Sequence, residues 1–245
     1  MSESVIYNNL NFSIMKKRIL FMVTSADVIG PKNRKTGSLL TELAHPYEAF
    51  KKQGYEIDIY SVKGGEAPID LVELDDPINQ AFLNDDGLIK MKNTKSIDNV
   101  SIDDYDAVFV PGGLGPVVDM TDNPPVQHLL ASFYDSGKVV SAVCHGPVSL
   151  GNVKLKDGSY LVKGKHVTGF SAAEEAGYAK DDVPFELEDL LKERGADYSA
   201  VDPWQPHSIT DGRLVTGQNP ASAQGVAEKV IAILESAAVL ESSKA

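Results

Sequence analysis

The only cysteine of the chain, Cys144, lies in segment 139–150 (VVSAVCHGPVSL), directly after an apolar, β-branched run. A strand that ends at a cysteine and is followed by glycine and proline has the form of a nucleophile elbow, which holds a side chain at the carboxyl edge of a sheet. Oriented amides of a helix after this turn lower the pKa of a thiol. We therefore expect Cys144 to be an ionised, reachable nucleophile, although a lone cysteine can also be a small buried apolar residue.

Two further side chains are suited to acid–base chemistry. His145 adjoins the cysteine, and a sharp turn would place its ring beside the thiol; otherwise it is a surface or packed histidine. Glu42 is the only charged residue in an apolar row of a predicted helix, with Leu39, Pro46 and Ala49. If the row is buried, burial raises the pKa of the Glu42 carboxyl, and the neutral acid could exchange a proton with thiolate or substrate. At the flank of the helix, Glu42 would reach solvent instead.

A glycine pair follows another apolar run, in segment 109–120 (FVPGGLGPVVDM). The backbone N–H groups of Gly112 and Gly113 could form an oxyanion hole or an anion-binding nest at the same edge of the sheet. A Gly-Gly turn is a weak signal by itself. The sequence carries neither a phosphate-binding loop nor a dinucleotide-binding fingerprint.

Short apolar runs alternate with helical patterns along the chain. We expect strands at 18–23, 56–62, 106–110, 139–143 and 213–217, and helices around 39–50, 126–133, 185–191 and 226–234. This alternation predicts an α/β fold with a doubly wound, mostly parallel sheet covered by helices on both faces.

The length of 245 residues fits one large α/β domain, which we place at residues 15–245. Residues 1–14 are polar and aperiodic, and we expect them to form a flexible N-terminal arm. Segment 64–104 is the least regular. It could be a surface excursion or a cap over a site, and its composition favours the excursion.

The formal net charge of −12 disfavours nucleic acid and anionic membranes as general partners. A single cysteine cannot form an internal disulfide, and the N-terminal segment lacks the pattern of a secretory signal. We therefore expect a cytoplasmic protein.

Five segments together resemble the ThiJ/PfpI superfamily, whose fold is also that of class I glutamine amidotransferase-like proteins. They are SAVCHGP, VPGGLGP, TGSLLTELAHPYEAF, VTGFSAAEE and WQPHSITDGRLVTGQNPASA. They are most similar to the HchA-type branch of chaperone-like, glutathione-independent glyoxalases (glyoxalase III). The likeness extends from about residue 15 to residue 234.

This resemblance implies a flavodoxin-like sandwich, usually dimeric, with the single cysteine as nucleophile. It implies His145 as the triad histidine and Glu175 as the third member, with Glu174 as the alternative one position away. Glu42 matches the acidic residue that the superfamily places against the thiol. The backbone N–H groups of Gly113 and His145 would face the oxyanion.

The chain departs from the branch at two places. Leu114 stands where many members have histidine, so we expect the substrate-binding mouth of the site to differ. After FSAAEE, the segment AGYAK replaces more acidic residues. Both changes bear on specificity and leave the nucleophile in place.

The resemblance implies a glyoxalase III-like lyase that needs no cofactor and no metal. Its substrate would be a small reactive carbonyl compound, methylglyoxal or a related 2-oxoaldehyde, and its product a 2-hydroxy acid. The thiolate of Cys144 would form a hemithioacetal, and Glu42 or His145 would move a proton between the two carbons through an enediol. Hydrolysis of the resulting thioester would complete the reaction. The expected assembly is a homodimer.

Two alternatives use the same cysteine. One is a hydrolase of the peptidase, amidase or deglycase type. A glutaminase subunit is disfavoured because no histidine is followed two positions later by glutamate. The other is a non-enzymatic stress holdase or redox sensor, in which Cys144 is oxidised reversibly.

Overall fold

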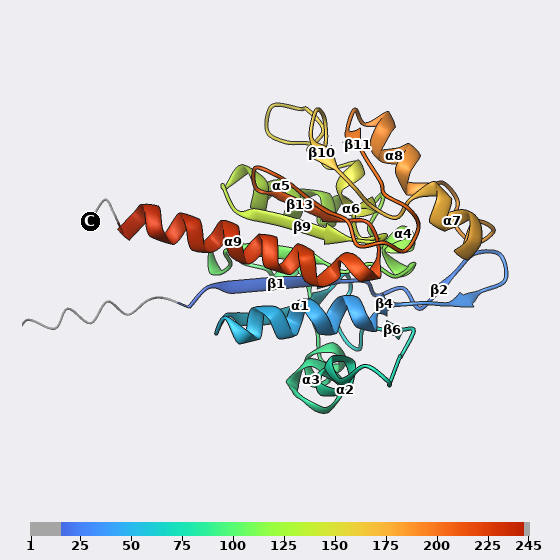
Figure 1. The fold of residues 1–245 in the computed structure, drawn as a ribbon, viewed down its shortest axis with the longest axis horizontal. Coiled ribbons are helices and arrows are strands. Elements are labelled where there is room, and N and C mark those ends of the chain that lie inside the picture. Colours follow the sequence, from blue (N-terminus) through green and yellow to red (C-terminus); the bar gives the residue numbers. More distant parts are fainter. Residues whose placement is uncertain (1–15, 243–245) are drawn as a thin grey trace, which may run out of the picture.

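The structure, a computed structural model, describes residues 16–242, so the arm predicted at residues 1–14 lies outside the described residues. The strands of the main sheet are β1 (Arg18–Val23), β5 (Glu56–Ser61), β7 (Lys95–Ser96), β8 (Ala107–Val110), β9 (Val139–Val143), β12 (Ser208–Asp211) and β13 (Leu214–Gly217). Within the described range they form one seven-stranded sheet in the order β12-β13-β9-β8-β1-β5-β7 (Figure 1).

The sheet is parallel except at β12, which pairs antiparallel with β13. The five strands predicted from apolar runs all form, and they occupy the centre of the sheet in the flavodoxin-like order β5-β1-β8-β9-β13. β8, β9 and β13 are buried at every position, because helices cover both faces. The two strands that the pattern missed, β7 and β12, are edge strands with polar residues.

The helices are α1 (Leu40–Lys52), α2 (Pro77–Asn84), α3 (Asp86–Lys92), α4 (Gly115–Asp119), α5 (Pro124–Asp135), α6 (Val148–Gly151), α7 (Ala172–Tyr178), α8 (Leu187–Glu193) and α9 (Ala223–Ser242). The short 3₁₀ helices are η1 (Ile97–Asn99), η2 (Ile102–Asp104) and η3 (Pro220–Ser222). α1 and α9 contact each other on one face of the sheet, and α5 packs on β8 and β9 (Figure 1). In the part of the chain that is described, no helix combines the length and apolar character needed to cross a bilayer.

Three two-stranded pairs lie outside the main sheet. β2 (Val28–Ile29) pairs with β3 (Arg34–Lys35), β4 (Ser38–Leu39) with β6 (Ile69–Asp70), and β10 (His166–Val167) with β11 (Asp197–Tyr198). The β4–β6 pair ties the start of segment 64–104 to the start of α1. Later in that segment, α2 packs on α1, with the rings of Tyr47 and Phe82 edge to face at 5.2 Å.

Candidate active site

Elements far apart in sequence meet beside Cys144. β9 ends directly before Cys144, and β8 ends two residues before Gly112, so both residues leave the same edge of the sheet. α1 starts at this edge, where the N–H of Leu39 donates to the carbonyl oxygen of Gly112 (3.3 Å). The site lies at the carboxyl ends of the central strands, where doubly wound folds bind ligands.

The backbone of Cys144 is left-handed, with a φ of +61°. This conformation is strained for a residue with a side chain and fits the sharp turn of the predicted nucleophile elbow. Gly146 makes the turn possible, because a Cβ at this position would lie only 2.5 Å from the carbonyl oxygen of Val110.

Two expectations about the thiol are wrong. Cys144 is only 3% exposed, whereas we expected a reachable side chain. Burial, and after it the neighbouring Glu42 carboxyl, raise the pKa of the Cys144 thiol well above its ordinary value, whereas we expected a lowered pKa. The N–H groups of Gly113 and His145 act in the opposite direction and are outweighed. The following helix, α6, has four residues and begins only at Val148, so its dipole contributes little.

The ring of His145 lies between a thiol and a carboxyl. Its Nδ1 is 3.6 Å from Sγ of Cys144, and its Nε2 is 2.6 Å from Oε2 of Glu175. All three side chains are buried. A carboxylate at Nε2 favours the tautomer with the proton on Nε2, which leaves Nδ1 able to accept a proton from the thiol. Glu175, rather than Glu174, is therefore the residue that contacts the histidine.

Glu42 is completely buried, as the apolar-row interpretation requires. Its Oε2 accepts a hydrogen bond from the N–H of Gly112 (2.6 Å), and its side chain also interacts with Cys144. Burial raises the pKa of Glu42 to about 8, against the opposing effects of these two hydrogen bonds. At neutral pH Glu42 is thus a neutral acid beside the sulfur.

The glycine pair fits the site because neither position has room for a side chain. A Cβ on Gly112 would lie 2.7 Å from Oε2 of Glu42 and 2.8 Å from Cβ of Cys144. Gly113 has a φ of +85°, and a Cβ there would meet the carbonyl oxygen of Gly37 at 2.2 Å. The N–H of Gly113 interacts with the sulfur, as expected of a group that would face an oxyanion.

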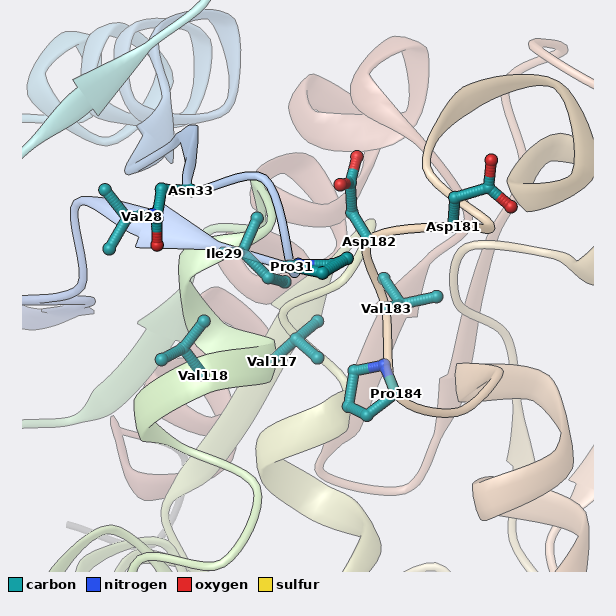
Figure 2. A pocket seen from close by; sticks show the side chains of 11 residues that line it. Val28, Ile29, Pro31, Asn33, Val117, Val118, Asp181, Asp182, Val183 and Pro184 are labelled. Carbon is teal, nitrogen blue, oxygen red and sulfur yellow. The ribbon is translucent and has the colours of Figure 1, made fainter.

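Leu114 does not lie at the mouth of this site. Its side chain is fully buried in a small apolar cluster with Ile29, Val117 and Ala179. On the outer side of this cluster is a cavity of about 590 Å³. We call it the hairpin cavity, because the β2–β3 hairpin contributes to its lining. Figure 2 shows its lining of valines, Ile29 and prolines, together with Asn33, Asp181 and Asp182. Leu114 is therefore a packing residue beneath β2 and α4, contrary to the expectation of a substrate contact.

Another cavity, of about 580 Å³, shares one lining residue, Tyr178, with the aromatic surroundings of His145; we call it the Trp204 cavity. It is lined by Leu39, Thr41, His45, Leu71, Glu73, Tyr178, Trp204, Pro220, Ala221 and Gln224. The ring centroid of Tyr178 is 6.4 Å from that of His145. Leu71 and Glu73 belong to segment 64–104, so part of this segment walls the cavity.

Sequence reasoning missed the role of Glu174. This buried carboxylate accepts hydrogen bonds from the Ser171 N–H and hydroxyl, the Trp204 N–H and the side-chain amides of Gln218 and Asn219. It joins the start of α7 to the loop that carries Trp204. The adjacent acids at 174–175 in SAAEEAG were the only available signal, because the partners come from distant segments. Among residues 16–242, His, Cys, Asp and Glu side chains form no group of three or more that could hold a metal ion.

Residues 36–233 match the DJ-1/PfpI family. Among curated proteins, the chain is 34% identical to Glyoxalase 3 of Candida albicans, covering 90% of this chain and 99% of that protein. It is 35% identical to the glutathione-independent glyoxalase HSP31 of Saccharomyces cerevisiae, covering 90% and 98%.

Solved structures show the same likeness. The chain is similar to the Rapid Encystment Protein of 24 kDa from Francisella tularensis, with a TM-score of 0.83, 42% identity and coverage of 87% of this chain and 97% of that one. The crystal structure of glyoxalase III from Candida albicans gives a TM-score of 0.80 at 33% identity, with coverage of 89% and 97%.

Proposed function

Because the chain belongs to the DJ-1/PfpI family, we propose that it is a glutathione-independent glyoxalase that converts methylglyoxal or a related 2-oxoaldehyde into a 2-hydroxy acid. The observation that carries the proposal is the buried arrangement of Cys144, His145 and Glu175 with Glu42 against the sulfur. The names of the relatives at about a third identity support the same activity.

The reaction begins with proton transfer from the thiol. Nδ1 of His145, 3.6 Å from Sγ, takes the proton of Cys144 while Glu175 stabilises the imidazolium. This transfer explains how a thiol whose pKa is raised can still react, since the charge is created only as sulfur attacks the aldehyde carbon. The aldehyde C=O bond opens, and the N–H groups of Gly113 and His145 stabilise its oxygen.

The next steps move a proton from C1 to C2 of the bound substrate and then hydrolyse the resulting thioester with one water. The hemithioacetal loses its C1 proton and gains one at C2, and the pair Glu42 and His145 carries these transfers through an enediol. The product is a thioester of the 2-hydroxy acid. Attack by water breaks the C–S bond, releases the acid and returns the proton to sulfur, so that methylglyoxal and water give lactate.

Lactate formation from methylglyoxal in glutathione-free buffer tests the proposal. The parent should produce lactate, and Cys144→Ala and Glu42→Gln should each reduce the rate to background while keeping the parent's circular dichroism spectrum. Val118→Ala, at the remote hairpin cavity, serves as the control and should match the parent. Lactate production by Cys144→Ala at the parental rate would refute the proposal.

A cysteine hydrolase is the second candidate, because a Cys–His–Glu arrangement is also that of cysteine peptidases and amidases. A panel of fluorogenic peptides and amides, assayed beside methylglyoxal on the same preparation, separates the two. Cleavage that depends on Cys144, without lactate formation, would favour the hydrolase.

We also propose a homodimer in the cytoplasm as the working form, on the strength of the resemblance and the single cysteine. Sedimentation velocity at micromolar concentration measures the assembly. A monomer at all concentrations would refute this part of the proposal.

A further inference from the structure

Two strained apolar residues line the Trp204 cavity. Leu71 and Trp204 both have left-handed backbones, with φ of +47° and +65°, yet neither is a glycine. Both side chains remain about half exposed, at 46% and 49%. Strain and exposure of large apolar side chains each cost free energy, and such costs tend to collect at sites that bind ligands.

The wall of this cavity leads inward to the triad. Trp204 packs edge to face against Phe170 (5.6 Å between centroids) and Tyr178 (6.1 Å). Phe170 in turn lies 4.3 Å from the ring of His145. An unbroken set of aromatic rings thus joins the outer rim of the cavity to the histidine beside Cys144.

The cavity is far larger than methylglyoxal needs. Its volume of about 580 Å³ falls in the range of roughly 300–1,000 Å³ that holds drug-sized ligands. Two aromatic rings and four aliphatic residues, Leu39, Leu71, Pro220 and Ala221, make most of its lining. Thr41, His45, Glu73 and Gln224 add polar groups, and His45 is already bonded to Asp76 at 2.7 Å.

From this arrangement we propose that the Trp204 cavity binds the substituent of the substrate, and that the preferred 2-oxoaldehydes carry a bulky apolar or aromatic group. The dicarbonyl end faces Cys144, and the substituent lies against Trp204, Tyr178 and Leu71. Trp204 and Leu71 are specificity-determining residues, because a bulky substituent would contact their apolar surface and methylglyoxal is too small to do so. This inference rests on the proposed glyoxalase function.

Turnover of two aldehydes tests the preference. The parent should show a higher kcat/KM for phenylglyoxal than for methylglyoxal. Trp204→Ala should lower the ratio of the two kcat/KM values about tenfold or more, and Trp204→Phe should restore much of it. Val118→Ala, in the hairpin cavity, should keep the parental ratio. An unchanged ratio in Trp204→Ala would overturn the inference, even if both aldehydes are turned over.

Binding provides a readout that needs no turnover. Trp204 is the only tryptophan of the chain, so its fluorescence reports directly on the cavity. Acetophenone, a ketone with no aldehyde group, should quench it saturably in both the parent and Cys144→Ala, and more weakly in Leu71→Ser. Acetone is the matched small ketone. Saturable quenching by acetophenone in a protein that turns over neither aldehyde would support the subsite and refute the glyoxalase function. Acetophenone quenching no stronger than that of acetone would overturn the subsite.

Discussion

Nε2 of His145 lies 2.6 Å from Oε2 of Glu175, and both side chains are at most 2% exposed. This contact orients the imidazole so that its other nitrogen faces the sulfur of Cys144. Glu175 acts through the histidine and does not reach the sulfur, so it is a positioning residue.

Replacing Glu175 with glutamine should lower kcat for methylglyoxal by roughly 10²-fold, because the neutral amide does not stabilise the imidazolium that forms during attack. Steady-state kinetics with methylglyoxal measures the effect. Glu175→Asp should retain part of the activity. A glutamine variant with the parental kcat would contradict the positioning role.

The buried acid Glu42 should make stability depend on pH. Its pKa is about 8 in the folded protein, against an ordinary value of 4.5. Between these two values the folded protein keeps a proton that the unfolded chain has lost, so the free energy of unfolding falls as pH rises, by about 1.4 kcal/mol per unit from this group. Above pH 8 the contribution is constant.

Urea unfolding of the parent and Glu42→Gln from pH 5 to 8 measures this contribution, because the variant lacks this one carboxyl and the pH range lies below the raised pKa of the Cys144 thiol. Between pH 5 and 8, the free energy of unfolding of the parent should fall by up to roughly 4 kcal/mol more than that of the variant. Parallel stability curves for the two proteins would show that Glu42 does not hold its proton in the folded state.

Gly112→Ala should disrupt the site. The new methyl group would lie within 2.8 Å of the Glu42 carboxylate and of Cys144, which must then move apart. We expect a loss of about 1–3 kcal/mol of stability and a roughly 10²-fold fall in kcat/KM for methylglyoxal. Gly177→Ala is the matched control, because Gly177 lies inside α7 and a Cβ added there would meet no atom within 4 Å. That change should stabilise the protein by about 0.5–1 kcal/mol. Equal effects of the two substitutions would contradict the crowding at position 112.

Glu174→Gln should loosen the loop that carries Trp204. The Glu174 carboxylate accepts hydrogen bonds from the N–H groups of Trp204, Gln218 and Asn219. The side-chain NH₂ of a glutamine would face these donors without being able to accept, which should lower the free energy of unfolding by about 1–3 kcal/mol. Urea unfolding and hydrogen exchange at residues 199–207 measure the loss. The exposed Glu193→Gln should change stability by less than about 0.5 kcal/mol. Unaltered exchange in this loop would show that Glu174 does not anchor it.

Leu114→His should destabilise the protein by about 2 kcal/mol or more, because an imidazole would replace a leucine fully buried among Ile29, Val117 and Ala179. Leu114→Met should cost less than about 1.5 kcal/mol. Chemical denaturation compares them. A histidine variant as stable as the parent would mean that position 114 can turn toward solvent.

Much of the fold could be read from local pattern. The apolar runs at 18–23, 106–110 and 139–143 predict buried parallel strands, because only such strands are apolar on both faces. The edge strand β12 was missed because its residues are half-polar and only partly buried. The strained turn at Cys144 was predictable from the glycine and proline that follow it.

Sequence patterns alone identify the side chains that could react: one thiol, the adjacent histidine, and an acid at position 42 inside an apolar row. Coordinates are needed to show that the thiol is buried and its pKa raised, that Glu175 contacts the histidine while Glu174 anchors a loop, and that Leu114 packs away from the site. The difference arises because helix and strand periodicity are local, whereas solvent exclusion and hydrogen-bond partners depend on segments 30 to 70 residues apart, such as those of His145 and Glu175 or of Glu42 and Gly112.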